Sequence, residues 1–389
     1  MLSSLRDSFK RNTYSTKFIP EIDGMRFFAI MTVVIFHLNT AYSREMGLDL
    51  KAVNTMLGDA SFFGLGWWIK RFDIGVKVFF AISGFILAVP FIKYYVADGN
   101  KINIKNYFIR RLLRLEPPFI ISMILFFFVH LLVLKADVNE LLKSFGVGIL
   151  YLHTTVFGVY NPINPVSWSL ETEAQFYILV PLLMTFIFIS KKKIWIYVLF
   201  LILFMFSVLS KNYIMTRGNG HFNLGILAFL VNFMVGIFTA FLYVMNKNIF
   251  QVKNYIWDVI YLLSIFIMFS FYKPQDEIFN IILMNFGLFI FIISVFKSKV
   301  INWFFTRPII YTIGGMCYSI YLLHYAFYHL SVKFTSKIMI FNEYPSNFVV
   351  QILINVPIVL LVSSIFFLLF EKPFMNNNWI KKMNFKKLR

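Results

Sequence analysis

The chain alternates between apolar runs of helix length and short polar stretches rich in lysine and arginine. An apolar run of about 20 residues crosses the hydrocarbon core of a bilayer, because a helix rises about 1.5 Å per residue and the core is about 30 Å thick. We therefore expect an all-α polytopic membrane protein. The pattern predicts about ten transmembrane helices, at residues 22–42, 74–95, 117–135, 168–189, 194–209, 223–245, 255–272, 278–296, 309–331 and 347–370.

The basic residues of the connecting segments orient these helices. With the amino terminus in the cytoplasm, most loop lysines and arginines fall on the cytoplasmic side, as the positive-inside rule requires. Ten spans then place both termini in the cytoplasm. We expect a basic N-terminal segment at 1–21, one membrane domain at 22–374 and a basic tail at 375–389, with no further domain boundary or internal repeat. The first apolar run is predicted to be a retained span, because no clear signal-peptide cleavage site follows it.

Two outer stretches are apolar but interrupted. Residues 141–160 contain Gly146, Gly148 and Gly158 and run into two Asn-Pro pairs, which favours a re-entrant or interfacial segment over a further span. Residues 58–69, which are rich in glycine and tryptophan, predict an interfacial outer loop for the same reason.

Composition narrows the class of protein. The 389 residues are 59% hydrophobic and 14% charged, with a mean hydropathy of +0.73, which is typical of an integral membrane protein. The net charge of +19 comes from basic clusters between apolar runs, and this distribution argues for topology signals and against nucleic-acid binding. The single cysteine, Cys317, excludes an intrachain disulfide and a cysteine-based zinc site, and we expect no metal.

The first predicted span carries two ionisable residues on one face. Arg26 and His37 are eleven residues apart, so their directions differ by about 20° and their heights by about 16 Å. An arginine inside hydrocarbon costs roughly 2.5 to 3.5 kcal/mol on insertion scales. This helix is therefore expected to line a polar passage, although Arg26 alone could also be a snorkelling residue at the cytoplasmic boundary.

Three ionisable side chains from different spans are predicted to fall in one layer of the outer half of the membrane. They are His37, Glu173 and His324. A carboxylate among apolar side chains must be protonated or paired, and His37 is the natural partner of Glu173. Glu171 points about 200° away on the same helix, so we expect only one of the two acids to face the site. His324 alone could also be a helix-packing residue.

A histidine paired with a carboxylate is suited to general-base catalysis on a hydroxyl. With no nucleophile elbow or metal cage in the sequence, direct attack of that hydroxyl on an activated donor, such as an acyl thioester, is the simplest reaction. The arginines near the inner face, Arg26, Arg110, Arg111 and Arg114, suit the phosphates of coenzyme A. One alternative is a transporter or flippase in which Arg26, His37 and Glu173 form a relay path for a proton or a substrate. A second alternative is a different class of membrane O-acyltransferase that is built around a deep histidine.

The chain resembles the acyltransferase 3 family in six motifs that follow the family's order. They are IDGMRFFAIMTVVIFH from residue 22, GVKVFFAISGFIL from 75, YFIRRLLRLEP from 107, NPVSWSLETEAQFY from 164, GGMCYSIYLLH from 314 and FEKPF from 370. The resemblance implies a ten-helix enzyme of a bacterial inner or plasma membrane. Such an enzyme moves an acyl group, most often acetyl, from cytoplasmic acyl-CoA to a hydroxyl of an extracytoplasmic glycan or lipid-linked glycan.

The resemblance also implies roles for residues at the matching positions. The catalytic pair is His37, as general base, with Glu173. The implied donor contacts are Arg26, Arg110, Arg111 and Arg114, and the implied substrate-lining residues are Asp23, Ser83, Trp168, Tyr177 and His324.

The sequence departs from the family pattern at three points. Lys77 stands where the family usually has an acid, and Cys317 where it often has serine. The appended esterase-like domain of many members is absent from this sequence. Because Lys77 lies near the outer end of its span, we hypothesise that it favours an anionic acceptor.

Overall fold

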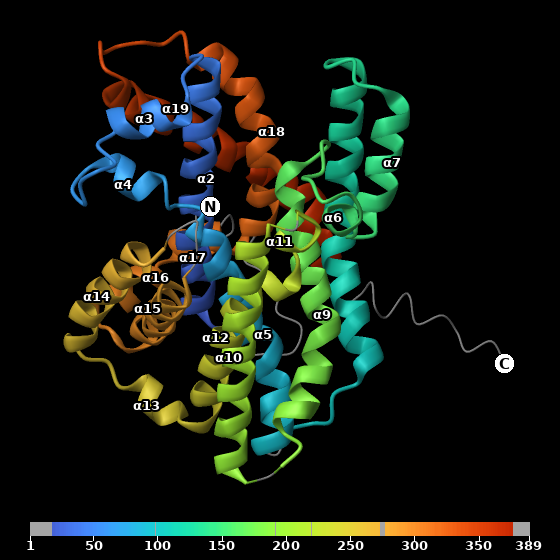
Figure 1. The fold of residues 1–389 in the computed structure, drawn as a ribbon, viewed down its shortest axis with the longest axis vertical. Helices are drawn as coiled ribbons and strands as arrows, with labels where there is room; N and C mark the ends of the chain where they lie inside the picture. The colour runs from blue at the N-terminus through green and yellow to red at the C-terminus, as the bar shows by residue number, and fades with distance from the viewer. Residues whose placement is uncertain (1–17, 98, 191, 219, 273–276, 376–389) are drawn as a thin grey trace, which may run out of the picture. The chain divides into compact units, whose positions relative to one another are not determined.

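A computed structural model of the protein describes residues 18–97, 99–190, 192–218, 220–272 and 277–375. Most of the predicted basic N-terminal segment and nearly all of the predicted tail lie outside the described residues. Within them the chain forms helices joined by turns and contains no β-strand, as the apolar pattern predicts (Figure 1). Helices suit a bilayer because each satisfies its own backbone hydrogen bonds.

Eight described segments are long and apolar enough to cross a membrane, so the chain is a multi-pass membrane protein. Each of the eight helices coincides with one of the predicted spans. They are α2 (Pro20–Glu45), α5 (Ile74–Val96), α6 (Ile104–Leu132), α9 (Trp168–Ile187), α10 (Lys193–Arg217), α12 (Ile226–Met245), α15 (Ile278–Lys297) and α19 (Tyr344–Phe366).

The other two predicted spans correspond to shorter helices. One is α14 (Ile256–Ser270), an apolar helix of 15 residues. The other divides at Met316 into α17 (Pro308–Gly315) and α18 (Cys317–Thr335). The predicted count of ten spans therefore depends on these two regions.

Helix α6 differs from the prediction at its start. It begins at Ile104, well before the apolar run at residue 117, because the Asn103 side chain accepts a hydrogen bond from the Asn106 amide at 2.9 Å and caps the first turn. The basic motif at residues 110–114 consequently lies on the helix itself and not in a loop.

The two interrupted outer stretches form short helices. Residues 141–160 hold the end of α7 (Val138–Ile149) and all of α8 (His153–Phe157), separated at Tyr151, which has a φ of 58°. No single helix crosses this stretch. The stretch at 58–69 includes α4 (Leu65–Ile69), which follows α3 (Leu50–Met56).

The chain folds as two units, each made of separate stretches of sequence. Unit 1 combines residues 1–72, 103–145 and 308–389. Its central helix is α2, which packs against α17, α18 and α19, and Figure 1 shows α2 and α18 side by side. A Cβ at Gly314 of α17 would overlap the Asp23 carbonyl, so glycine lets the two backbones touch there. The unit ends in the π-helical turn η2 (Phe367–Glu371) and η3 (Lys372–Met375).

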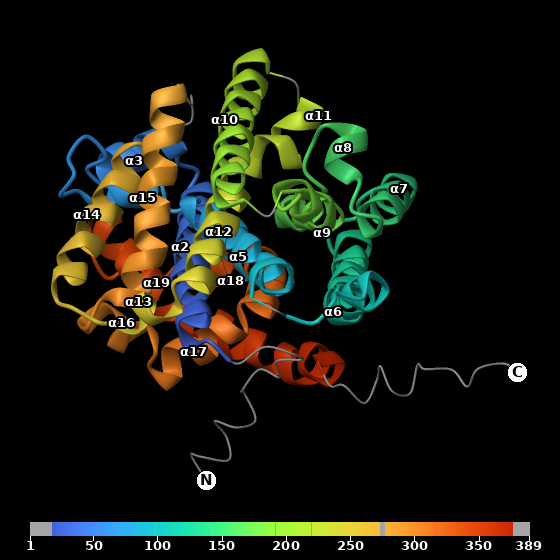
Figure 2. The same cartoon turned by 90° about the horizontal axis from the view of Figure 1, so that it is seen from below.

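Unit 2 combines residues 73–102 and 146–307. Its core is the packing of α5 on α12, with α10 on the other side of α12 and α14 beside α15 (Figure 2). Gly84 of α5 faces the Phe233 carbonyl and Gly236 of α12 faces the Ala81 carbonyl, each too close for a Cβ. Small residues at such crossings are typical of membrane helix pairs. Its short helices are η1 (Pro165–Ser167), α11 (Gly220–Asn223), α13 (Lys247–Gln251) and α16 (Val300–Phe305).

Candidate active site

Unit 1 brings two predicted site residues into direct contact. His37 of α2 and His324 of α18 are hydrogen-bonded through His37 Nδ1 and His324 Nε2, which are 2.9 Å apart. His324 is fully buried, whereas His37 keeps part of its surface exposed. His37 is therefore the more accessible residue of the pair.

The His324 ring is held by its own helix as well. Its Nδ1 lies 3.0 Å from the Ile320 carbonyl oxygen and 2.9 Å from the Tyr321 carbonyl oxygen, one turn earlier in α18. On the other side of the pair, the Tyr325 ring meets the His37 ring edge to face, with centroids 5.4 Å apart. Both imidazoles are thus fixed in orientation by neighbouring groups.

The start of α18 is held by a buried carboxylate. Glu371 Oε2, at the end of η2, accepts hydrogen bonds from the Ser319 amide at 3.1 Å and the Ser319 hydroxyl at 2.5 Å. Ser319 is in the first turn of α18, where backbone amides have no partner within the helix. Glu371 therefore caps the helix that carries His324. In the sequence, Glu371 stands out only as part of the FEKPF motif, although an acid at the end of an apolar run is a signal for such a role.

The start of α2 carries a second group of buried charges. Arg26 Nη1 lies 2.5 Å from Asp23 Oδ1, and both residues are buried. Arg114 of α6 acts electrostatically on Asp23 and on Glu371, and Arg26 acts on Glu371. We call Asp23, Arg26, Arg114 and Glu371 the ionic cluster. Burying these charges requires their mutual compensation, so Arg26 and Asp23 have a structural role whether or not they contact a substrate.

The other predicted donor contacts lie on the first turns of α6. Arg110 Nε donates to the Asn106 carbonyl oxygen at 3.2 Å, and the Arg111 guanidinium lies 5.9 Å from the Tyr107 ring centroid. Both arginines are half-buried. The Nε of Arg114 is buried and has no hydrogen-bond partner within the described part of the chain. Their binding of a donor stays a prediction.

Unit 2 contains the predicted carboxylate. Glu173 of α9 accepts a hydrogen bond at 2.6 Å from the hydroxyl of Ser83 on α5, so two predicted site residues meet here also. His37 belongs to unit 1 and Glu173 to unit 2, and the predicted pairing of His37 with Glu173 stays a prediction.

Glu171 has different partners from Glu173. Its Oε2 accepts from the Thr154 amide at 2.8 Å and the Thr154 hydroxyl at 2.7 Å, which ties α9 to the first turn of α8. At this first turn, burial lowers the pKa of His153, so its ring is neutral at neutral pH. Glu171 therefore holds the N-terminal end of α9 in place.

Two predicted substrate-lining residues are aromatic residues of α9. The Trp168 ring packs against Phe229, with centroids 5.2 Å apart, and against Phe80 at 6.2 Å. Tyr177 is half-buried on the same helix. The packing of Trp168 fixes the start of α9, and the contact of either residue with a substrate stays a prediction.

Lys77 is paired within unit 2. Its ammonium lies 3.0 Å from Asp73 Oδ2, and the Tyr272 hydroxyl contacts both groups. Only 7% of Lys77 is exposed, so its charge is directed to Asp73. The structure shows that Lys77 has a local ion pair with Asp73. The hypothesis that Lys77 selects an anionic acceptor stays a prediction.

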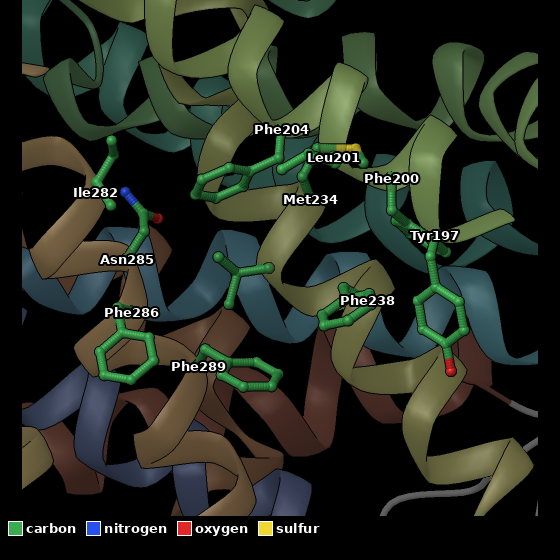
Figure 3. A pocket seen from close by; sticks show the side chains of 11 residues that line it. Tyr197, Phe200, Leu201, Phe204, Met234, Phe238, Ile282, Asn285, Phe286 and Phe289 are labelled. Carbon is green, nitrogen blue, oxygen red and sulfur yellow. The ribbon is translucent and has the colours of Figure 1, made fainter. Parts of the chain in front are cut away.

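Unit 2 also has an apolar groove of about 320 Å³ between α10, α12 and α15. The phenyl rings of Phe204, Phe238, Phe286 and Phe289 lie around it (Figure 3). Its one amide, on Asn285, accepts a hydrogen bond from Asn232 at 2.8 Å. None of the predicted site residues lines this groove. Within the described residues, no group of three or more His, Cys, Asp or Glu side chains could hold a metal ion.

The chain is similar to proteins named as O-acetyltransferases. It is 27% identical over 340 residues to O-acetyltransferase OatA of Staphylococcus aureus strain NCTC 8325, which covers 82% of this chain and 52% of that protein. It is 25% identical over 393 residues to a putative O-acetyltransferase of S. aureus strain COL, which covers 95% of this chain and 59% of that protein. The chain thus spans between half and three fifths of the length of these relatives. No solved structure matches it.

A family model also matches most of the chain. The model described as an acyltransferase domain covers residues 19–368, which contain five of the six motifs in full. The long apolar helices and the order of the motifs agree with this match. The chain therefore belongs to the acyltransferase 3 family.

Proposed function

We propose that the protein is a membrane O-acetyltransferase that moves an acetyl group from cytoplasmic acetyl-CoA to a hydroxyl of an extracytoplasmic glycan or lipid-linked glycan. The observation that carries the proposal is the hydrogen bond that holds the His37 ring against the buried His324. An imidazole fixed in this way is suited to removing a proton from a hydroxyl. Family membership and the names of the relatives support an acyl group as the cargo.

The reaction needs one general base and no covalent enzyme intermediate. His37 takes the proton of the acceptor hydroxyl as the oxygen forms a bond to the thioester carbonyl carbon. The carbon–sulfur bond then breaks, the coenzyme A thiolate leaves, and the proton held by His37 returns to the thiolate or to solvent. The products are the acetyl ester and free coenzyme A. Glu173, with its hydrogen bond from Ser83, is the proposed charge-balancing group.

The donor side of the proposal depends on the arginines of α6. Arg110, Arg111 and Arg114 lie within the first three turns of this helix, next to a basic segment assigned to the cytoplasm. Guanidinium groups bind phosphate oxygens in pairs of hydrogen bonds, which suits the phosphates of coenzyme A. Arg26 and Asp23 would then hold the adjoining start of α2 in position through their ion pair.

The groove of unit 2 supports a lipid-linked acceptor. It lies between three membrane helices and its wall is almost entirely apolar, so a hydrocarbon chain can occupy it without loss of hydrogen bonds. A glycan attached to such a chain would be held at the membrane surface. The acetyl group would then be transferred to the glycan before the glycan is released from its lipid.

The test is transfer activity of the full chain with and without His37. Cells carrying the wild type should add an acetyl mass increment to their envelope glycans, and purified protein should release thiol from acetyl-CoA when those glycans are supplied. His37→Ala should lower turnover by about 10²- to 10⁴-fold, the usual contribution of a general base.

The matched control is His221→Ala, which removes a histidine of α11 whose Nδ1 lies 3.0 Å from the Thr155 carbonyl oxygen. This variant should keep full activity. Full activity in His37→Ala would overturn the assignment of the base. Movement of the glycan across the membrane with no release of thiol from acetyl-CoA would instead favour a transporter or flippase.

A further inference from the structure

The hydrogen bonds around His324 determine which nitrogen of that ring carries a hydrogen. His324 Nδ1 lies 3.0 Å and 2.9 Å from two backbone carbonyl oxygens. A carbonyl oxygen can only accept a hydrogen bond, so Nδ1 must be the protonated nitrogen. In a neutral imidazole the other nitrogen, Nε2, then has the lone pair.

The hydrogen bond between the two rings also determines which nitrogen of His37 carries a hydrogen. Its Nδ1 is 2.9 Å from His324 Nε2, and two nitrogens at this distance need one donor and one acceptor. Since His324 Nε2 is the acceptor, His37 Nδ1 is the donor. The Val33 carbonyl, one turn earlier in α2, also interacts with the His37 ring.

We propose that His324 is a positioning residue that holds His37 in the Nδ1–H tautomer, so that the lone pair of His37 is on Nε2, the nitrogen that receives the substrate proton. This inference rests on the proposed function for its chemistry and on the two hydrogen-bonded rings for its geometry. In a Ser-His-Asp triad an aspartate fixes the tautomer of the base. Here a neutral imidazole, itself fixed by the backbone of α18, has that role.

The arrangement also stabilises the protonated base. When His37 takes a proton on Nε2, its Nδ1–H keeps the hydrogen bond to His324 Nε2, and that bond becomes charge-assisted and stronger. His324 is fully buried and needs no rearrangement at this step. A base whose hydrogen-bond partner is already in place loses little energy to reorganisation during the reaction.

Two variants separate hydrogen bonding from packing. His324→Leu removes the acceptor, so His37 can take either tautomer and can place its lone pair on the wrong nitrogen. We expect kcat to fall by about 10²- to 10⁴-fold, up to the scale of a wrong tautomer in a triad, with little change in the KM for acetyl-CoA. His324→Gln puts an amide oxygen near the position of Nε2 and should recover at least about tenfold of that loss. His221→Leu is the control for a histidine elsewhere in the chain.

The tautomer of His37 can be measured by NMR, independently of enzymatic activity. Full-length protein labelled with ¹⁵N-histidine, compared with His37→Gln to assign the signals, should show His37 with a protonated Nδ1 and a bare Nε2. His324→Leu should shift this population and His324→Gln should restore it. A protonated Nε2 in the wild type, or equal kcat values for the Leu and Gln variants, would overturn the inference. Absence of acetyl transfer with the expected tautomer would overturn only the proposed function.

Discussion

Replacement of Glu371 tests whether one carboxylate holds the start of α18. Its Oε2 accepts two hydrogen bonds from Ser319, and the carboxyl group is fully buried. Hydrogen bonds to a charged group contribute about 1.5 to 3 kcal/mol each, and a buried helix cap about 0.5 to 2 kcal/mol. Removal of the charge also recovers part of its desolvation cost. For Glu371→Ala we expect a net loss of about 3 kcal/mol.

Glu371→Gln separates the charge from the hydrogen bonds. The amide oxygen can still accept from Ser319, while the amide nitrogen would take the place of Oε1, which has no hydrogen-bond partner among the described residues. The remaining loss is the electrostatic attraction of Arg114 and Arg26 to the Glu371 carboxylate. We expect about half the effect of the alanine variant, because one of the two stabilising contributions is retained.

The assay is thermal unfolding in detergent, with the intrinsic fluorescence of the purified protein. For a cooperative unit of about 150 to 250 residues, 1 kcal/mol shifts the midpoint by about 2 to 4 °C. The midpoint should therefore fall by about 6 to 12 °C in Glu371→Ala and by about half as much in Glu371→Gln. Glu343→Gln, an exposed acid before the other end of α19, is the matched control and should unfold with the wild type. If Glu371→Ala also unfolds with the wild type, the carboxylate does not stabilise α18.

Three further predictions concern the donor, the core of unit 2 and the groove. Arg111→Ala should raise the Kd for acetyl-CoA, measured by calorimetry, about tenfold or more, and the effect should depend on salt. Arg217→Ala, at the C-terminal end of α10, is the control and should leave the Kd unchanged. Equal Kd values for the two variants would show that Arg111 is a topology signal. Gly236→Ala should lower the unfolding midpoint, because the new Cβ would overlap the Ala81 carbonyl. Gly146→Ala, whose Cβ would meet open space, is the control and should not lower it. Equal midpoints would mean that the backbones of α5 and α12 can separate freely. A lipid with a photoreactive diazirine in its acyl chain should label the groove peptides, which contain Phe204, Phe238 or Phe286, as mapped by mass spectrometry. These peptides should be labelled more than the peptide with the exposed Val259 of α14. Equal labelling would count against an occupied groove.

The positions of the spans followed from the sequence because the bilayer imposes a length and a polarity on every segment that crosses it. Helices such as α5 and α15 begin and end within a residue or two of the predicted limits. The extension of α6 to Ile104 was missed, because a helix that continues into water carries polar residues and leaves no apolar signal. The break at Met316 was missed because both halves of that region are apolar.

The partners of the site residues were harder to predict. Helical spacing indicated that Glu171 and Glu173 point in different directions, and they have different partners, Thr154 and Ser83. Depth in the membrane suggested a common layer for His37 and His324 but not a hydrogen bond between them, because depth gives no direction around a helix axis. The two units were not expected either. Since each is assembled from stretches that alternate along the chain, no single linker marks a boundary.

The composition of unit 1 sets the order in which its parts can come together during biosynthesis. The helix with His37 leaves the ribosome well before α18 and Glu371. Insertion of α2 into the membrane therefore precedes the arrival of its imidazole partner. A nascent chain cannot hold its base in a fixed orientation until α18 and the turn with Glu371 have been made, so the reactive geometry of unit 1 forms only after its last stretch has been synthesised.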